Sequence, residues 1–321
     1  MDQFRAMRVF ARVADEGSFA AAARSLDMAP AVVTRVVAEL EEHLGARLMN
    51  RTTRKLALTD VGADYLDRVR RILSDVDEAE AMAGANTQEA RGTVRLLVPP
   101  AVSVHQLAKH LPRFYRQYPH VQLEIDAFGP VEAASEAHDI AIVWTRAPLE
   151  GEFIARRLAR TETIVCASPE YLDRHGRPEH PQELSDHVAM LPPIGDFQRG
   201  LTFHRGPWGD DEPGGEQVTV VPRRPVLVTS HVDTNYAAAL AGVGITGLPS
   251  YVAEDALMEH ALERVLCEWH LFSATLWATM PSRQHLPART RAVLDFLLTI
   301  FGGEDRDPWL AAAGCETVRK I

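Results

Sequence analysis

The 321-residue chain has few cysteines and no long apolar run. Its three cysteines, Cys166, Cys267 and Cys315, lie far apart, which fits a reducing compartment and gives no zinc-type C-x2-C spacing. Since no run of about 18 apolar residues occurs, we expect no transmembrane helix. The opening residues MDQFRAMRVF have no apolar core segment and are not typical of a secretory signal. A cytoplasmic protein without a membrane partner is therefore expected.

Signatures of catalysis and of metal binding are also missing. Neither H-E-x-x-H nor the G-x-S-x-G nucleophile turn occurs. Residues 242–247 match G-x-G-x-x-G, but a helix is predicted before them and a strand after them, the reverse of a dinucleotide site. We expect these glycines to end a helix, and we expect His175, His180 and His187 on the solvated surface. No catalytic residue, no metal and no cofactor is predicted.

Charge is unevenly spread over a chain whose net charge is −10. Residues 1–58 contain nine basic and seven acidic residues, whereas residues 59–87 contain three and seven. An acidic protein is a poor bulk binder of nucleic acid. A slightly basic head on an acidic body is still compatible with a focused contact to DNA.

The pattern of residues divides the chain into four parts. Residues 1–58 are helical and rich in alanine, with a possible small wing at 52–58. Residues 59–87 have a narrow apolar seam along one predicted helix, which is typical of a helix that pairs with a partner helix. A surface helix that packs on its own domain is the alternative. Strands and helices then alternate to about residue 303, which predicts a parallel α/β sheet, and 304–321 read as a mobile tail with one short helix at most.

A helix-turn-helix pattern lies within the first part, in FAAAARSLDMAPAVVTRVVA at 19–38. Ala23 is small where two helices must approach, and Asp27 can adopt the left-handed conformation that the turn needs. Val33 and Val36 occupy the buried side of the next helix, and the opposite side would face a major groove. Many three-helix bundles share this pattern, so a plain bundle remains open at this point.

The longer segment FxxVADEGSFAAAARSLDMAPAVVTRVVAELEEHLGARLMNRTTRKLALTDVG, from Phe10 to Gly62, resembles the LysR-type transcriptional regulators. A weaker resemblance extends to about residue 300 through SPEYL at 168–172 and ALAGVGITGLP at 239–249. The resemblance implies a winged helix-turn-helix DNA-binding domain at 1–58 and a linker and dimerisation helix at 59–87. It also implies an effector-binding domain at 88–303 that is similar to periplasmic binding proteins, followed by the tail.

The resemblance also implies that the binding partner is double-stranded DNA. The residues at the matching positions are Ser18, Phe19, Ala29, Pro30, Ala31, Thr34, Arg35, Arg51, Thr53 and Arg54. Family members usually have serine where Ala29 stands and another near Ala31, and glycine is common at the position of Asp27. The loss of these serines removes a helix N-cap and polar DNA contacts, which makes operator preference less certain than DNA binding itself.

Two α/β subdomains joined by crossing strands are implied for the effector domain, with subdomain I at 92–165 and 267–300 and subdomain II at 166–266. Ligands in such folds bind at the carboxyl ends of strands. The residues at those ends are Pro100, Ala101, Val102, Ser103, Phe128, Gly129, Trp144, Thr145, Arg146, Ser230 and His231. An aromatic effector could stack on Trp144 or Phe128, and a carboxylate could meet Arg146 or His231. The alternative is that these residues only shape loops.

We therefore predict an effector-modulated DNA-binding regulator that is a dimer through helix 59–87 and a tetramer through its effector domains. Two other classes are weighed against it. A solute-binding module would explain the α/β part but not residues 1–58. A metabolic enzyme would require a catalytic constellation, which the sequence does not offer.

Overall fold

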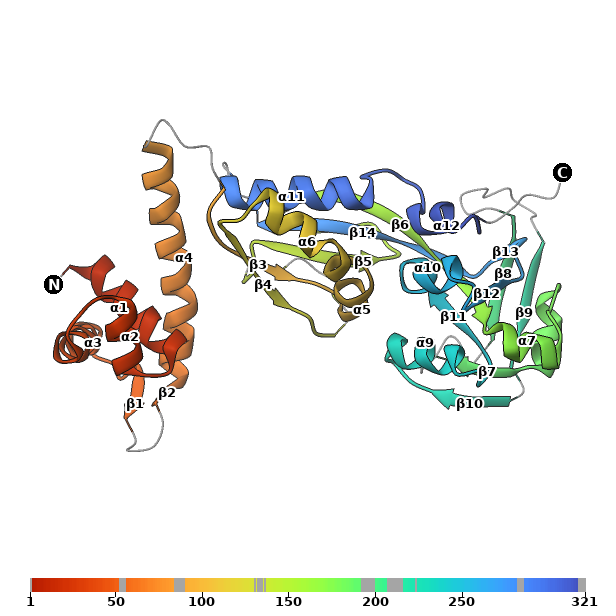
Figure 1. The fold of residues 1–321 in the computed structure, drawn as a ribbon, viewed down its shortest axis with the longest axis horizontal. Helices are drawn as coiled ribbons and strands as arrows, with labels where there is room; N and C mark the ends of the chain where they lie inside the picture. The colour runs from red at the N-terminus through yellow and green to blue at the C-terminus, as the bar shows by residue number, and fades with distance from the viewer. Residues whose placement is uncertain are drawn as a thin grey trace. The chain divides into compact units, whose positions relative to one another are not determined.

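The computed structural model describes residues 2–51, 56–83, 90–129, 131, 135, 137–191, 200–206, 216–222, 224–281 and 286–316. The chain divides into two compact units, Met1–Gln88 and Glu89–Ile321. Each unit has its own hydrophobic core. Figure 1 shows the helices and strands of both units. Within the described residues, no helix is long and apolar enough to cross a membrane.

The first unit is a helical head with a small hairpin. Its elements are α1 (Gln3–Glu16), α2 (Phe19–Ser25), α3 (Pro30–Leu44), β1 (Met49–Arg51), β2 (Leu56–Leu58) and α4 (Asp60–Ala83). Strands β1 and β2 pair antiparallel and form the predicted wing. Helix α1 is central to the core, because its apolar side chains at three- and four-residue spacing contact α2, α3 and α4.

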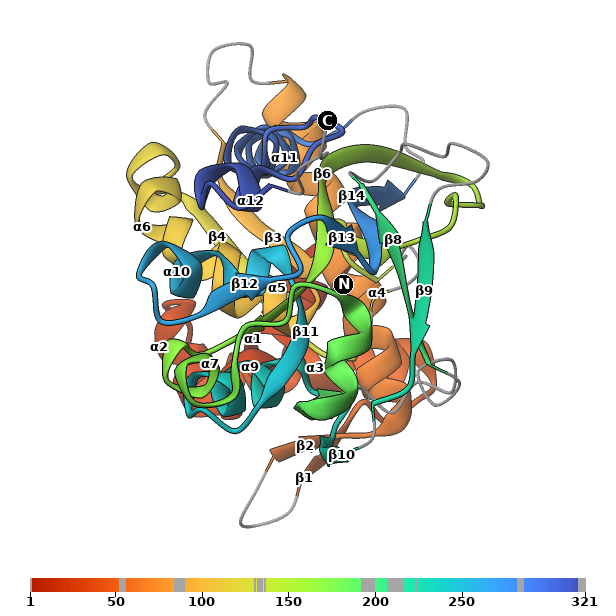
Figure 2. The same cartoon turned by 90° about the vertical axis from the view of Figure 1, so that its right-hand side faces the viewer.

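The second unit is built on one large sheet whose strands run in the order β10-β7-β11-β6-β14-β5-β3-β4, with β12 also paired to β6. Their bounds are β3 (Gly92–Leu97), β4 (Val121–Asp126), β5 (Ile140–Thr145), β6 (Phe153–Ala167), β7 (Val188–Leu191), β10 (Arg224–Val228), β11 (Ile245–Pro249), β12 (Glu263–Val265) and β14 (Phe272–Pro281). Strands β3, β4 and β5 pair in parallel, as the strand–helix alternation predicts. A separate small sheet has the order β13-β8-β9, with β8 (Leu201–Arg205), β9 (Gln217–Val220) and β13 (Trp269–His270) (Figure 2).

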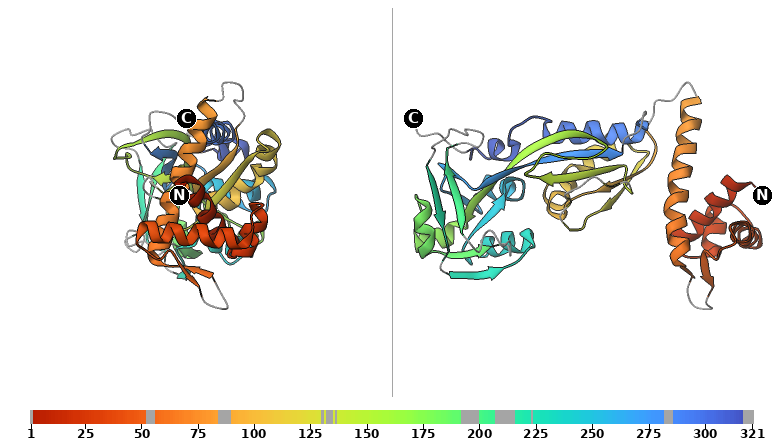
Figure 3. Two further views of the ribbon diagram at one scale, coloured as in Figure 1. Left: turned by 90° about the vertical axis from the view of Figure 1, so that its left-hand side faces the viewer. Right: turned by 180° about the vertical axis from the view of Figure 1, so that it is seen from behind.

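Two long antiparallel strands, β6 and β14, connect the halves of this unit. Strand β14 pairs with β6 from Phe272 opposite Thr163 to Pro281 opposite Phe153, and with β5 on its other side. Beyond Thr163, strand β6 pairs instead with β11 and β12. The two halves are therefore hydrogen-bonded into one continuous sheet, and α11 (Ala288–Phe301) lies along it (Figure 3).

The remaining helices cover the sheet and its ends. They are α5 (Pro100–Val102), the π-helix η1 (Ser103–Leu107), α6 (Ala108–Gln117), α7 (Pro169–His175), the 3-10 helix η2 (Pro181–Asp186), α9 (Val232–Leu240), α10 (Ser250–Met258) and α12 (Pro308–Ala312).

The turn between α9 and β11 confirms that the glycines of residues 242–247 end a helix. Gly242 adopts φ of 73°, and a Cβ on Gly244 would lie 2.5 Å from the carbonyl oxygen of Val188.

The expectation of a mobile C-terminal tail is wrong for residues 304–316. Helix α12 packs against α10, and Trp309 and Leu310 are 3% and 1% exposed in the core of the second unit. The buried carboxylate of Asp307 caps this helix by accepting hydrogen bonds from the backbone amides of Trp309 and Leu310. It also accepts one from the amide of Glu162 on β6, at 2.7 Å, so the segment is held to the sheet.

Candidate DNA-binding surface and effector cavity

Helix α3 has one buried face and one free face. Val33, Val37 and Leu40 are fully buried in the head core. Ala31, Arg35, Ala38 and Glu39 are exposed on the other side, because residues three and four apart share a face of a helix. The Arg35 side chain is 72% exposed, and its Nε lies 3.5 Å from Glu39 Oε1. This free face is available to a groove of DNA.

The turn before α3 has the conformation that the helix-turn-helix pattern predicts. Asp27 adopts φ of 50°, in the left-handed region. Ala29 takes the N-cap position of α3 with φ −67° and ψ 136°, and no side chain caps the helix there. At the start of α2, by contrast, Ser18 Oγ accepts a hydrogen bond from the Ala21 amide at 3.4 Å.

The wing is anchored to α3 and α4 by side chains at its two ends. Glu41 Oε1 accepts hydrogen bonds from the amides of Leu48 and Met49, at 2.8 and 3.0 Å. Thr59 caps α4 by accepting from the Gly62 amide at 2.9 Å. A Cβ on Gly62 would lie 1.9 Å from the Leu48 carbonyl oxygen, so only glycine fits this approach. The start of the wing is thereby fixed relative to α3.

The predicted DNA-contact residues lie at several places in the head. Ala29, Pro30 and Ala31 are exposed at the start of α3, with Thr34 half-buried and Arg35 exposed one turn later. Ser18 and Phe19 lie at the start of α2, where Phe19 packs against the head core. Arg51 ends β1. Thr53 and Arg54 lie outside the described residues.

Helix α4 packs partly on its own head. Leu66 and Val69 are buried in the head core, and Arg70 forms an ion pair with Asp15 on α1. Ile72, one turn further along, is 39% exposed. The first half of α4 therefore packs on its own domain, as the alternative interpretation of residues 59–87 predicts. Beyond it, the apolar side chain of Ile72 is exposed.

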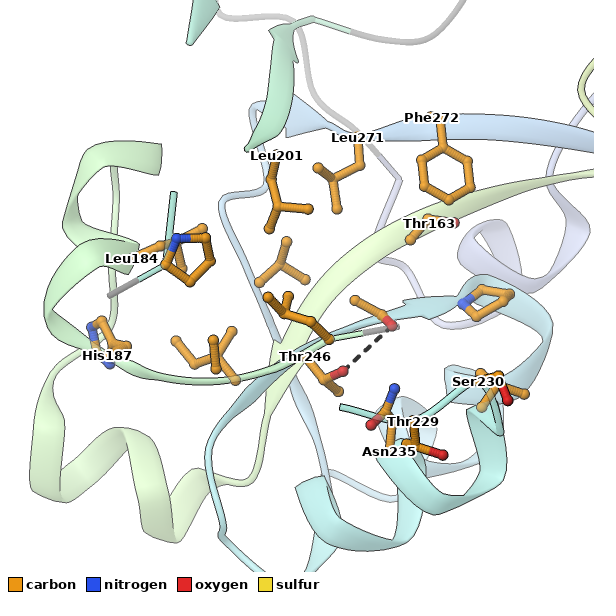
Figure 4. Close-up of a pocket in the computed structure, with 18 of the residues that line it drawn as sticks. Thr163, Leu184, His187, Leu201, Thr229, Ser230, Asn235, Thr246, Leu271 and Phe272 are labelled. Atoms are coloured by element: carbon orange, nitrogen blue, oxygen red, sulfur yellow. Dashed lines mark hydrogen bonds between the residues drawn. The ribbon is translucent and has the colours of Figure 1, made fainter. Parts of the chain in front are cut away.

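A cavity of about 160 Å³ lies in the second unit, mainly among elements of predicted subdomain II (Figure 4). Its wall is formed by β6, β7, β11, the start of α9 and the start of β14, with Trp144 of β5 also on the wall. The lining residues are Trp144, Thr163, Val165, Leu184, His187, Ala189, Leu191, Leu201, Pro222, Thr229, Ser230, Val232, Asn235, Ile245, Thr246, Gly247, Pro249, Leu271 and Phe272. An apolar cavity with a few polar groups is typical of a small-molecule site.

The cavity contains two of the predicted effector residues, Trp144 and Ser230. The others lie elsewhere. Ala101 and Val102 are buried in the core, Phe128 is 61% exposed next to Gly129, and Pro100 and Ser103 lie in the α5–η1 segment. Thr145 donates a hydrogen bond to the Ala147 carbonyl, His231 is exposed at the N-cap of α9, and the Arg146 guanidinium lies 4.6 Å from the centroid of the Phe272 ring.

Two of the buried polar side chains in the cavity wall, Asn235 and His187, were not among the predicted effector residues. Asn235 is 3% exposed, and no described residue makes a hydrogen bond to its Oδ1. His187, expected on the surface, is instead 7% exposed, and its Nδ1 lies 3.2 Å from the Tyr171 hydroxyl. Burial lowers the pKa of His187, so the ring is neutral near pH 7. The only signal for Asn235 in the sequence was an amide among the alanines of helix 233–241.

Side chains of η1 and of the start of α6 contact α9 and α10 beside the cavity. His105 Nε2 lies 2.8 Å from Asp233 Oδ1 on α9. Gln106, which is buried, donates to the Tyr251 carbonyl at 2.7 Å, and Lys109 pairs with Glu254 at 2.6 Å. These contacts connect η1 and α6 to α9 and α10.

Comparisons with known proteins agree with this architecture. Residues 4–63 match the bacterial regulatory helix-turn-helix protein, lysR family, and residues 87–301 match the LysR substrate binding domain. A transcriptional regulator of Xanthomonas campestris is 31% identical over 91% of this chain and 83% of its own length. The regulator CrgA of Neisseria meningitidis serogroup C is 32% identical over 92% of this chain and 96% of its own.

Solved structures show the same fold. The structure of CrgA, a LysR-type transcriptional regulator from Neisseria meningitidis, is 30% identical in sequence; the match covers 93% of this chain and 98% of the CrgA chain, with a TM-score of 0.55. The chain belongs to the LysR family of transcriptional regulators. It is thus a DNA-binding regulator with a C-terminal effector-binding domain, and its family regulates transcription rather than catalysing a reaction.

Proposed function

We propose that the free face of α3 reads the operator in the major groove, through Ala31, Thr34 and Arg35. The wing residues Arg51, Thr53 and Arg54 would contact the phosphates. The division of α3 into a fully buried apolar face and an exposed face with Arg35 carries this proposal. Arginine can donate two hydrogen bonds to guanine, whereas the alanines offer only apolar contact.

The remaining parts of the chain would join copies of the protein on the operator and would let a small molecule change operator binding. Two copies pair through α4 at 59–87, and dimers join into tetramers through the effector domains at 88–303. A small molecule in the cavity changes the balance between two arrangements of these domains, and it can do so only through unequal affinity for them. A chromosomal operator would place the protein in the cytoplasm.

Footprinting on the DNA upstream of the protein's own gene tests the operator contact, at 50 and 200 mM salt. We expect protection of two or more helical turns, weaker at the higher salt because phosphate contacts release counterions. Arg35→Ala should weaken operator binding by about 1–3 kcal/mol and relax the preference at one base pair.

Arg12→Ala is the matched control, because it removes the same charge from the exposed face of α1. It should change operator affinity little. If both substitutions weaken operator binding equally, Arg35 contributes only through its charge. If Arg35→Ala leaves operator affinity and base preference unchanged, Arg35 does not lie on the contact surface.

A further inference from the structure

The described part of the cavity wall carries no charged side chain of the acidic or basic residues. Among the described residues that line it, none is aspartate, glutamate, lysine or arginine. Arg146 stacks on the Phe272 ring without lining the cavity, and Asp233 on α9 is paired with His105. A carboxylate placed here would lose its water without gaining a cation, which is unfavourable in an apolar environment.

Three polar groups of the wall have partners within the protein. Thr246 Oγ1 donates to the Met190 carbonyl at 3.0 Å, and Thr229 Oγ1 accepts from the His231 amide at 3.1 Å. His187 is beside the Tyr171 hydroxyl and is neutral near pH 7. The wall also contains the hydroxyls of Thr163 and Ser230, which are neutral, whereas these three groups already have partners within the protein.

Asn235 differs from them. Its side chain lies among the sticks at the α9 side of the cavity (Figure 4), and its Oδ1 is buried with no partner among the described residues. Buried amide oxygens are nearly always hydrogen-bonded, and an exception needs an explanation. A bound molecule with a donor group would supply the partner that Oδ1 lacks.

The size of the cavity limits that molecule. A volume of about 160 Å³ is close to that of an engineered apolar cavity that takes up benzene. The wall offers the Trp144 and Phe272 rings, whose centroids are 6.4 Å apart, together with aliphatic side chains. One ring, or a branched chain of similar size, fits these dimensions.

We propose that the cavity takes a neutral, single-ring or similarly small apolar ligand whose amide or hydroxyl group donates to Asn235 Oδ1, and that it rejects the carboxylate of the same shape. This inference rests on the proposed role of the cavity as the effector site. It replaces a carboxylate held by Arg146 or His231, which do not line the cavity.

Binding of benzamide, benzyl alcohol and benzoate to the full-length protein, measured by ligand-observed NMR at pH 7.5, tests the proposal. Benzamide and benzoate have nearly the same shape but differ by one charge. We expect benzamide or benzyl alcohol to bind at least about tenfold more tightly than benzoate, because the neutral wall cannot compensate the carboxylate. Equal or tighter binding of benzoate would overturn the neutral-ligand inference while leaving the cavity as the effector site.

Asn235→Leu tests the hydrogen bond, with toluene as the matched probe. Leucine is of similar size and removes the buried amide oxygen that has no partner among the described residues, so the variant should fold and should unfold at an equal or higher temperature. The two polar probes should bind about tenfold more weakly to it, whereas toluene binding should be unchanged. Unchanged benzamide and benzyl alcohol binding would exclude the Asn235 contact.

Absence of binding by all the neutral probes to the folded wild-type protein would also overturn the inference. Footprinting of the operator needs no ligand, so it decides the proposed DNA contact independently. Ala189→Phe, which places a ring in the cavity wall, should abolish binding of every probe. Binding that survives in this folded variant would place the ligand elsewhere and overturn both the inference and the proposed effector site.

Discussion

At the scale of single residues, His187 shows how burial determines charge in the cavity wall. The side chain is 7% exposed, and burial is the main reason that its pKa lies below the usual value of about 6.5. Nearby His175 lowers the pKa further, whereas Asp186 and Glu183 act in the opposite direction. In the unfolded chain these effects are lost, so the unfolded state binds a proton at a higher pH than the folded state.

This difference predicts a pH dependence of stability. The depressed pKa in the folded state stabilises the protein fully above pH 6.5, and this contribution is lost as the pH falls through the folded-state value. Between pH 6.5 and the folded-state pKa, the free energy of unfolding should fall as the pH is lowered, and His187 should contribute at most about 1.4 kcal/mol per pH unit to that slope. Urea unfolding at pH 8 to 5 should show a shallower slope for His187→Gln than for wild type. His231→Gln, an exposed histidine of the same domain, should keep the wild-type slope; equal slopes for all three would contradict the prediction.

At the scale of elements, helix α3 begins without a side-chain cap. The backbone of Ala29 already has the extended conformation of an N-cap residue, with φ −67° and ψ 136°. The first amides of the helix therefore lack the hydrogen bond that a serine hydroxyl would provide. The neighbouring helix α2 has such a cap at Ser18.

Ala29→Ser should therefore stabilise the head by about 0.5–1 kcal/mol, because the serine oxygen can accept from an amide in the first turn without moving the backbone. Urea unfolding of the full chain, followed in the head by far-UV circular dichroism, measures the change. Ala29→Val is the control, since valine adopts the same extended conformation but brings no oxygen and is as poor an N-cap as alanine. A gain with valine as large as with serine would rule out the hydroxyl as its cause.

Elements with local signals could be predicted closely from the sequence. A proline at position 30 favours the first turn of a helix and a glycine at position 45 favours its end, and α3 has these bounds. The docked segment at α12 could not be predicted, because the surface that buries Trp309 comes from distant parts of the chain. Most of the cavity was missed for the same reason: its wall joins β5, β6, β7, β11 and α9, and only Trp144 and Ser230 were among the predicted effector residues.

At the scale of the whole molecule, LysR-type regulators oligomerise, and α4 offers the surface through which we propose pairing. Leu66 and Val69 face the head core of their own chain. Ile72 remains 39% exposed, and Val76 follows it four residues later on the same face. An exposed isoleucine next to a second apolar side chain on a long helix is typical of a helix pair.

Ile72→Glu should separate the dimer, because the substitution would bury two like carboxylates in an apolar seam. Ala63→Glu is the matched control: it adds the same charge to an exposed position nine residues earlier, and nine steps of about 100° place it on the opposite side of α4. Sedimentation at micromolar concentration should give a lower mass for Ile72→Glu alone. That variant should also protect the operator more weakly and with a smaller salt dependence, since fewer phosphates are contacted by each bound unit. A wild-type mass for Ile72→Glu would move the dimer contact away from this face of α4.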